Sequence, residues 1–223
     1  MRRFDVLTFD CYGTLIDWER GIADAFATTA RADGVTLPRA AVLSAYHEME
    51  PRIQAERYRP YREVLTLAAR AVAERLGWSL APGRERFLPD SLPSWPPFAD
   101  TNAGLRRLKD AGHQLIILSN VDDDLLAGTR QHLAVEFDAA ITAQQVGSYK
   151  PALGHFTAAR ARIGAARWAH VAQSYFHDVQ PARAIGVPSV WINRKQERPL
   201  DGRGADHEFP TLDAAAAFLT TAA

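Results

Sequence analysis

The chain of 223 residues is poor in several features that would direct its interpretation. It has a single cysteine, Cys11, which excludes a disulfide within the chain. It has no charge excess, because 26 Lys+Arg balance 26 Asp+Glu, so no net field would attract nucleic acid or an anionic membrane. Its apolar runs, such as Leu115–Leu118, fall far short of the roughly 20 residues of a membrane helix, and the first residues, MRRFDVLTFD, lack an apolar signal core. We therefore expect a cytoplasmic protein whose partner is a small molecule.

Short apolar runs alternate with helical stretches along the chain. The runs are bounded by polar residues, glycine or proline, and they predict strands at Val6–Phe9, Leu115–Leu118, Ala139–Ile141, Val171–Ala172 and Val187–Ile192. Helices are predicted between the later runs, over Thr101–Ala111, Asp122–Leu133 and Leu153–Ile163. Strands that alternate with helices form a parallel sheet covered on both faces, with right-handed crossovers. The sequence thus predicts a doubly wound α/β core.

Roughly a hundred residues separate the first two predicted strands, too many for one crossover helix or a loop. Leu65, Val72 and Leu76 recur there at helical spacing, and Gly77 closes that helix. The proline-rich stretch LPSWPP at 92–97 is typical of a stiff linker. We expect residues 17–98 to form a helical cap domain inserted after the first strand, with 1–16 and 99–223 forming the α/β core domain.

A carboxylate follows the first predicted strand, in Phe9-Asp10-Cys11-Tyr12-Gly13-Thr14-Leu15. Asp10 thereby lies at the carboxyl edge of a central strand, where open α/β sheets bind ligands. Gly13 permits a sharp turn beside it. Taken alone, an aspartate at this point is equally well explained as a residue that initiates a turn.

Polar residues also occur at the ends of later predicted strands. Ser119 and Asn120 follow Ile116–Leu118, Lys150 lies in Ser148-Tyr149-Lys150-Pro151, and Asp178 follows the stretch 172–177. Each has a simple structural explanation as well. Ser119, Asn120 or Asp178 could cap a helix, and Lys150 could occupy a solvated turn.

Together and in this order, the four segments resemble the four motifs of the haloacid dehalogenase superfamily. The resemblance implies that Asp10 is a nucleophile and that Ser119 and Asn120 contact the reacting group. It further implies that Lys150 neutralises carboxylates around the nucleophile and that Asp178 is the acidic residue of the fourth motif.

The residue two positions after Asp10 separates reaction classes within this superfamily. Its phosphatases resemble one another in a second aspartate there, because an alkoxide leaving group needs a proton. This chain has Tyr12, and a phenol with a pKa of about 10 is a poor acid at neutral pH. A halide leaves unprotonated. The form Asp-x-Tyr-Gly-Thr-Leu, with Trp191-Ile192-Asn193-Arg194 near the last strand, resembles the type II 2-haloacid dehalogenases.

The resemblance to that branch implies hydrolysis of a short 2-haloalkanoic acid, a halogenated carboxylic acid, without a metal or cofactor. Asp10 attacks the carbon that bears the halogen, and Asp178, helped by Lys150, orients or deprotonates the water that cleaves the resulting ester. Backbone N–H groups of Cys11 and Tyr12 are expected to stabilise the oxyanion. The pocket is expected to be shaped by Thr14, Ser119 and Asn120. Such dehalogenases are commonly homodimers.

The chain departs from that pattern at two places. The fourth motif of these dehalogenases is Ser-x-Asn-x-x-Asp, and here Tyr175 replaces the asparagine. Glu48 stands where the second cap helix would carry an arginine that grips the halide or the carboxylate. Four residues could supply that cation instead or form a solvated basic face: Arg52, Arg57, Arg59 and Arg62. His177 could position water or a substrate carboxylate, or simply lie partly exposed at a helix start.

The same residues bear on three other functions. A Mg²⁺-dependent phosphatase would place the metal on Asp10 and Asp178, but Tyr12 disfavours it. A catalytically degenerate member would bind a ligand or a partner through the cap. Phosphonate hydrolysis in this superfamily uses a lysine of the cap. The chain's only lysines, Lys109, Lys150 and Lys195, all lie outside residues 17–98, so the sequence disfavours this reaction.

Overall fold

The protein is represented by a computed structural model that describes residues 2–199 and 201–221. The chain divides into two compact units. The helical unit comprises Trp18–Pro96 and Val121–Gln131, and the core unit comprises the described residues before, between and after these two segments.

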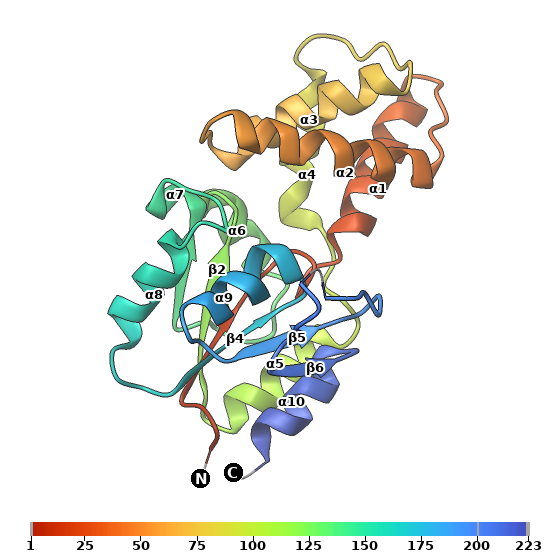
Figure 1. Cartoon of the computed structure of the whole chain (residues 1–223). Helices are drawn as coiled ribbons and strands as arrows, with labels where there is room; N and C mark the ends of the chain where they lie inside the picture. Colours follow the sequence, from red (N-terminus) through yellow and green to blue (C-terminus); the bar gives the residue numbers. More distant parts are fainter. Residues whose placement is uncertain (1, 200, 222–223) are drawn as a thin grey trace. The chain divides into compact units, whose positions relative to one another are not determined.

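The core unit is built on one sheet of six parallel strands in the order β3-β2-β1-β4-β5-β6 (Figure 1). The strands are β1 (Val6–Phe9), β2 (Gln114–Ser119), β3 (Ala139–Thr142), β4 (Trp168–Ala172), β5 (Ser189–Ile192) and β6 (His207–Phe209). The chain adds strands outward from β1 on one side, then returns to place β4 on the other side of β1. This reversal is the switch point at which open α/β sheets bind ligands. The predicted doubly wound α/β fold is confirmed.

The register of the sheet brings three strand ends to one edge. Phe9 of β1 pairs with Ile117 of β2 and with Val171 of β4. The Asp10 N–H continues the ladder by donating to the Val171 carbonyl at 3.1 Å. Residues that directly follow β1, β2 and β4 therefore meet at the carboxyl edge of the sheet.

Helices cover both faces of this sheet (Figure 1). On one face, α8 (Gly154–Ile163) and α9 (Gln180–Ala184) pack against the strands, with Phe156 inserted among apolar strand residues. On the other, α5 (Thr101–Asp110) and α10 (Leu212–Thr220) pack together. A short helix, α7 (Ala143–Val146), follows β3, and a π-helical turn, η3 (Tyr175–Val179), follows β4. β6 and η3 were not predicted from the sequence.

The helical unit contains α1 (Trp18–Ala32), α2 (Arg39–Glu56), α3 (Tyr61–Arg75), η1 (Arg84–Arg86), α4 (Phe87–Ser91), η2 (Leu92–Ser94) and α6 (Asp123–Arg130). The helix predicted from the apolar spacing between residues 65 and 76 is α3, and Gly77 follows it with a positive φ of 70°. Edge-to-face packing of Phe26 on Phe87, with ring centroids 5.0 Å apart, joins α1 to α4.

Segment 121–131 was expected in the α/β core domain, but it groups with the helical unit. The reason is that a residue of this segment caps the N-terminus of α3. Pro60 precedes α3 and has no side-chain acceptor, so the Asp122 carboxylate accepts from the N–H groups of Tyr61 and Arg62, both at 2.8 Å. Gly128 of α6 lies against Pro93, where a Cβ would come within 2.6 Å of the proline ring.

Across the described ranges 2–199 and 201–221, the model contains no helix with both the length and the apolar character of a membrane span.

Candidate active site

Three charged side chains from separate motifs converge at the carboxyl edge of the sheet. The ammonium of Lys150 donates to Asp10 Oδ1 at 2.9 Å, to Asp178 Oδ1 at 2.6 Å and to the Leu118 carbonyl at 2.8 Å. An ammonium has three N–H donors, so all of them are used. Lys150 and Asp178 are each 1% exposed, whereas the Asp10 side chain keeps 10% exposure. Asp10 is thus the carboxylate of this site that solvent-borne molecules can reach more easily.

The loop that carries Lys150 is fixed by Asn120. The Asn120 Oδ1 accepts from the Lys150 N–H at 2.7 Å, and its Nδ2 donates to the Lys150 carbonyl at 3.1 Å. The sequence predicted that Asn120 contacts the reacting group. In the structure its amide holds the backbone of the lysine, so its clearest role is to position Lys150.

Thr14 holds the second oxygen of the candidate nucleophile. Its hydroxyl donates to Asp10 Oδ2 at 2.8 Å and accepts from the Gln173 N–H at 2.8 Å, and the side chain is fully buried. The Gln173 carbonyl in turn accepts from the Trp191 indole at 2.7 Å. Thr14 was predicted to shape the pocket. Its observed contacts orient the Asp10 carboxylate, and its contribution to the pocket stays a prediction.

The turn after β1 is stabilised by a hydrogen bond from Arg194, a residue that follows β5. Gly13, with a φ of 101°, allows the turn, and its N–H donates to the Ile16 carbonyl at 2.8 Å. The Arg194 guanidinium donates to the Thr14 carbonyl at 3.0 Å and lies 4.0 Å from the centre of the Phe98 ring. The residue that prompted comparison with one branch of the superfamily therefore anchors the motif that carries Asp10.

Cys11 and Ser119 are both completely buried beside this centre. Burial raises the pKa of the Cys11 thiol well above its usual range, so this cysteine is an unreactive packing residue. The hydroxyl of Ser119 has no hydrogen-bond partner within residues 2–199 and 201–221. Buried polar groups are normally paired, so this hydroxyl is an exception beside the site. The predicted roles of the Cys11 and Tyr12 backbone N–H groups stay predictions.

The two carboxylates have pKa values pushed in opposite directions. Burial raises the pKa of Asp10, and the opposing effect of Lys150 does not cancel it. Asp178 is also buried, but the ammonium of Lys150 and then the imidazole of His170 hold the pKa of its carboxyl well below its usual range. Burial disfavours the charged form of Lys150, yet Asp10 and Asp178 raise its pKa overall. Carboxylates separated in this way can take different roles in one reaction.

The turn η3 sets the position of Asp178. Ser174 caps this turn, because its hydroxyl accepts from the His177 N–H at 3.1 Å and contacts the His177 ring nitrogen Nδ1 at 3.0 Å. The alternative explanation of Asp178 as a cap for a helix near Val179 is therefore wrong. Burial lowers the pKa of His177, which favours the neutral imidazole.

Tyr175, which replaces the asparagine of the fourth motif, turns toward the loop at 201–204. Its hydroxyl contacts Asp201 and accepts from Arg183 at 3.0 Å, and its ring packs on Trp191 with centroids 5.0 Å apart. This side chain serves the packing of the core unit.

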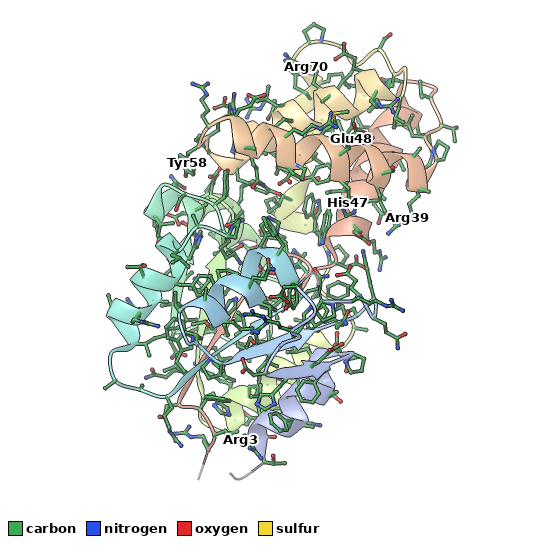
Figure 2. All side chains as sticks on the ribbon, in the orientation of Figure 1. Arg3, Arg39, His47, Glu48, Tyr58 and Arg70 are labelled. Carbon is green, nitrogen blue, oxygen red and sulfur yellow. The ribbon has the colours of Figure 1, made fainter. Side chains whose placement is uncertain are left out.

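The candidate cations of the helical unit all have carboxylate partners. Glu48 on α2, labelled in Figure 2, lies 2.9 Å from the exposed Arg52. Arg59 is only 11% exposed and contacts Glu56 and Glu63. The remaining pairs are Arg57 with Glu63, and Arg62 with Asp90 and Asp124. Whether one of these arginines takes the place of the family's cap arginine stays a prediction.

Two buried histidines next to the site were not identified from the sequence. His170 contacts Asp178 Oδ1 at 3.0 Å, and His155 donates from Nε2 to the Ser119 carbonyl at 3.0 Å. A histidine inside an apolar strand, as in Trp168-Ala169-His170-Val171-Ala172, is the signal that could have identified the first. No cluster of three or more His, Cys, Asp or Glu side chains fit to hold a metal occurs among the described residues.

Residues 4–186 match the family model of the haloacid dehalogenase-like hydrolases. The chain is 28% identical to the haloacid dehalogenase-like hydrolase domain-containing protein 3 of Mus musculus, covering 93% of this chain and 90% of that protein. It is also 28% identical to the (S)-2-haloacid dehalogenase of Pseudomonas sp. (strain YL), covering 97% and 95%. The fold superposes on the L-2-haloacid dehalogenase of Xanthobacter autotrophicus with a TM-score of 0.80 at 18% identity, over 99% of this chain and 100% of that one.

Proposed function

Because the chain belongs to the haloacid dehalogenase-like hydrolase family, we propose that it hydrolyses the carbon–halogen bond of short 2-haloalkanoic acids through an ester on Asp10. The observation that carries the proposal is the placement of one ammonium, Lys150, between two buried carboxylates, of which Asp10 is the more exposed. The relatives named 2-haloacid dehalogenases support the substrate class.

In the first step, a carboxylate oxygen of Asp10 attacks the carbon that bears the halogen, and the halide departs with inversion. Lys150 and Thr14 each donate one hydrogen bond to Asp10, which keeps it ionised and oriented while a lone pair stays available for attack. The halide needs no proton, which is consistent with Tyr12 at the position where the superfamily's phosphatases have an acid.

In the second step, water attacks the carbonyl carbon of the Asp10 ester, and Asp178 accepts the proton. Lys150 stabilises the negative charge that develops on the ester oxygen, together with the backbone N–H groups of Cys11 and Tyr12. As the ester bond breaks, the proton held by Asp178 passes to the leaving oxygen, which releases the 2-hydroxy acid, and the second proton of the water is lost to solvent as the Asp10 carboxylate is restored. Ser119, whose hydroxyl has no hydrogen-bond partner within the described residues, and the surrounding turn would receive the substrate carboxylate.

The test follows the solvent oxygen in a single turnover of 2-chloropropionate with enzyme in excess in ¹⁸O-labelled water. The proposed route places an unlabelled oxygen from Asp10 in the product and the label in the peptide that contains Asp10, which mass spectrometry reads directly. Asp10→Asn should abolish halide release, since an amide of the same shape is a poor nucleophile. A labelled first-turnover product with an unlabelled peptide would reduce Asp10 to a general base.

The phosphatase alternative is tested alongside, with an aryl phosphate in the presence and absence of Mg²⁺. Turnover of the phosphate ester that exceeds haloacid turnover would replace the proposed substrate class. If neither substrate class reacts faster than with the Asp10→Asn variant, the protein is a degenerate member that binds a ligand.

A further inference from the structure

A line of buried polar side chains on two neighbouring strands connects to the Asp178 carboxylate through hydrogen bonds. The Trp168 indole Nε1 donates to Thr8 Oγ1 at 2.8 Å, Thr8 Oγ1 lies 2.8 Å from His170 Nδ1, and His170 Nε2 lies 3.0 Å from Asp178 Oδ1. Thr8 is 0% exposed and His170 1% exposed. Thr8 on β1 and His170 on β4 face each other in the sheet register.

With a neutral His170 ring, the groups at the two ends of this line set the directions of its hydrogen bonds. An indole N–H can only donate, and an ionised carboxylate can only accept. Such a ring carries its proton on Nε2 and donates it to Asp178. The Thr8 hydroxyl can donate to His170 Nδ1 at 2.8 Å or to the Ala169 carbonyl at 3.4 Å, and the shorter contact assigns its proton to Nδ1. Thr8 accepts in turn from Trp168, so every buried polar atom in the line has a partner of the correct kind.

Both hydrogen bonds to Asp178 fall on one oxygen. Lys150 Nζ at 2.6 Å and His170 Nε2 at 3.0 Å both donate to Oδ1. With Oδ1 occupied, Oδ2 is the oxygen that can accept from water. A carboxylate held by Lys150 alone could rotate and exchange its two oxygens, because one hydrogen bond does not define a plane.

We propose that His170, oriented by Thr8 and Trp168, is a positioning residue that holds Asp178 with Oδ2 directed at the water that cleaves the Asp10 ester. The inference rests on the proposed function, and it assigns His170 to the second step only. The first step needs Asp10 and Lys150, which His170 does not contact through the hydrogen bonds described. The other titratable groups that act electrostatically around His170 are Asp178 and His155, and Phe156 packs on its ring at 5.0 Å.

The experiment separates the two steps in single turnovers of 2-chloropropionate. For His170→Leu we expect a halide burst close to the wild-type rate, and ester hydrolysis slowed about tenfold to a hundredfold, the range for a lost hydrogen bond to a charged group. The ester should then accumulate on the peptide that contains Asp10. The acid limb of the hydrolysis step should move to higher pH, because loss of the His170 hydrogen bond raises the pKa of Asp178.

Two further variants distinguish positioning from packing. His170→Gln keeps a donor near the Nε2 position and should recover part of the hydrolysis rate. Thr8→Val removes the hydroxyl at nearly constant shape and should slow hydrolysis less than His170→Leu does. If His170→Leu slows the halide burst and hydrolysis equally, or slows neither, the proposal is overturned. If His170→Leu does not fold, Thr8→Val and His170→Gln decide by the same criterion.

A readout independent of turnover keeps this inference separate from the proposed function. In ¹⁵N NMR spectra of the wild-type protein, His170 should show a protonated Nε2 and an unprotonated Nδ1 that accepts a hydrogen bond, and Thr8→Val should shift the Nδ1 resonance. A proton on Nδ1 would overturn the proposed line. Absence of any halide burst from the wild-type protein, with the expected tautomer present, would instead refute the dehalogenase function.

Discussion

Removal of the Thr14 hydroxyl should produce two effects that separate by pH. Thr14→Val keeps the shape of a fully buried side chain but deletes the donor to Asp10 Oδ2 and the acceptor of the Gln173 N–H. A hydrogen bond to a charged group is worth about 1.5–3 kcal/mol, so its loss raises the pKa of Asp10 further. The unpaired Gln173 N–H costs a further loss of about 1–3 kcal/mol in the free energy of unfolding.

The rate effect should appear only at acid pH. Because the pKa of Asp10 is already raised by burial, the acid limb of halide release lies above the range of an ordinary aspartate, and Thr14→Val moves it higher still. At the acid end of the pH profile, the rate of halide release by Thr14→Val should be about tenfold to a hundredfold below that of the wild type. The two rates should converge as the pH rises. The loss of stability from the unpaired Gln173 N–H, measured by thermal unfolding, should persist at acid pH, where the lost hydrogen bond to ionised Asp10 no longer contributes.

Thr14→Ser is the matched control, since it keeps the hydroxyl and loses only a methyl group. It should retain the wild-type acid limb. If Thr14→Val leaves the acid limb unmoved, the hydroxyl does not stabilise ionised Asp10. If Thr14→Ser is as impaired as Thr14→Val, the packing of the methyl group and not the hydrogen bond accounts for the effect.

Three further changes have definite expected outcomes. Lys150→Met should slow halide release at least about a hundredfold at pH 7, because loss of one partner of a buried ion pair costs about 3–5 kcal/mol. The acid limb of halide release should move to higher pH, because the pKa of Asp10 rises without the ammonium. A near-normal rate with an unmoved acid limb would contradict this role of Lys150. Burial lowers the pKa of His155 from 6.5 to about 4, so its neutral form stabilises the fold above pH 6.5 and that contribution is lost as pH falls toward 4. Denaturant titration should therefore show that, from pH 7 to pH 4.5, the free energy of unfolding falls by about 2 kcal/mol more in the wild type than in His155→Gln. Equal decreases would show that His155 is accessible to protons in the folded protein. Treatment with EDTA should leave haloacid hydrolysis unchanged, and a loss that Mg²⁺ reverses would favour the metal-dependent alternative.

The sequence was sufficient for the elements that are long or continuously apolar. The buried run at Val6–Phe9 is β1 to the residue, and the apolar spacing before Gly77 located α3. β6 was missed because His207-Glu208-Phe209 is short, lies at the edge of the sheet and is only partly buried. Neither an apolar run nor a clear alternation marks such a strand.

The motifs identified the charged residues of the site, but they did not indicate which hydrogen bonds the neighbouring side chains make. The resemblance implied that Lys150 neutralises the carboxylates around Asp10, and in the structure its ammonium donates to Asp10 and to Asp178. Thr14 was expected to shape the pocket and Asn120 to contact the reacting group, and the motifs did not indicate that their side chains hydrogen-bond to Asp10 and to the Lys150 backbone. These bonds join residues whose relative orientation depends on tertiary packing, which a motif does not encode.

The grouping of α6 with the helical unit limits how this protein can be recombined. The chain enters the helical unit twice, at Trp18 and again at Val121, so residues 18–96 are not a self-contained cassette. A chimera that exchanged only that segment would leave Asp122 without the N–H groups of α3 and would remove Pro93 from Gly128. Domain exchange between this chain and its relatives should therefore move segment 121–131 together with the insert, even though that segment directly follows Ser119 and Asn120.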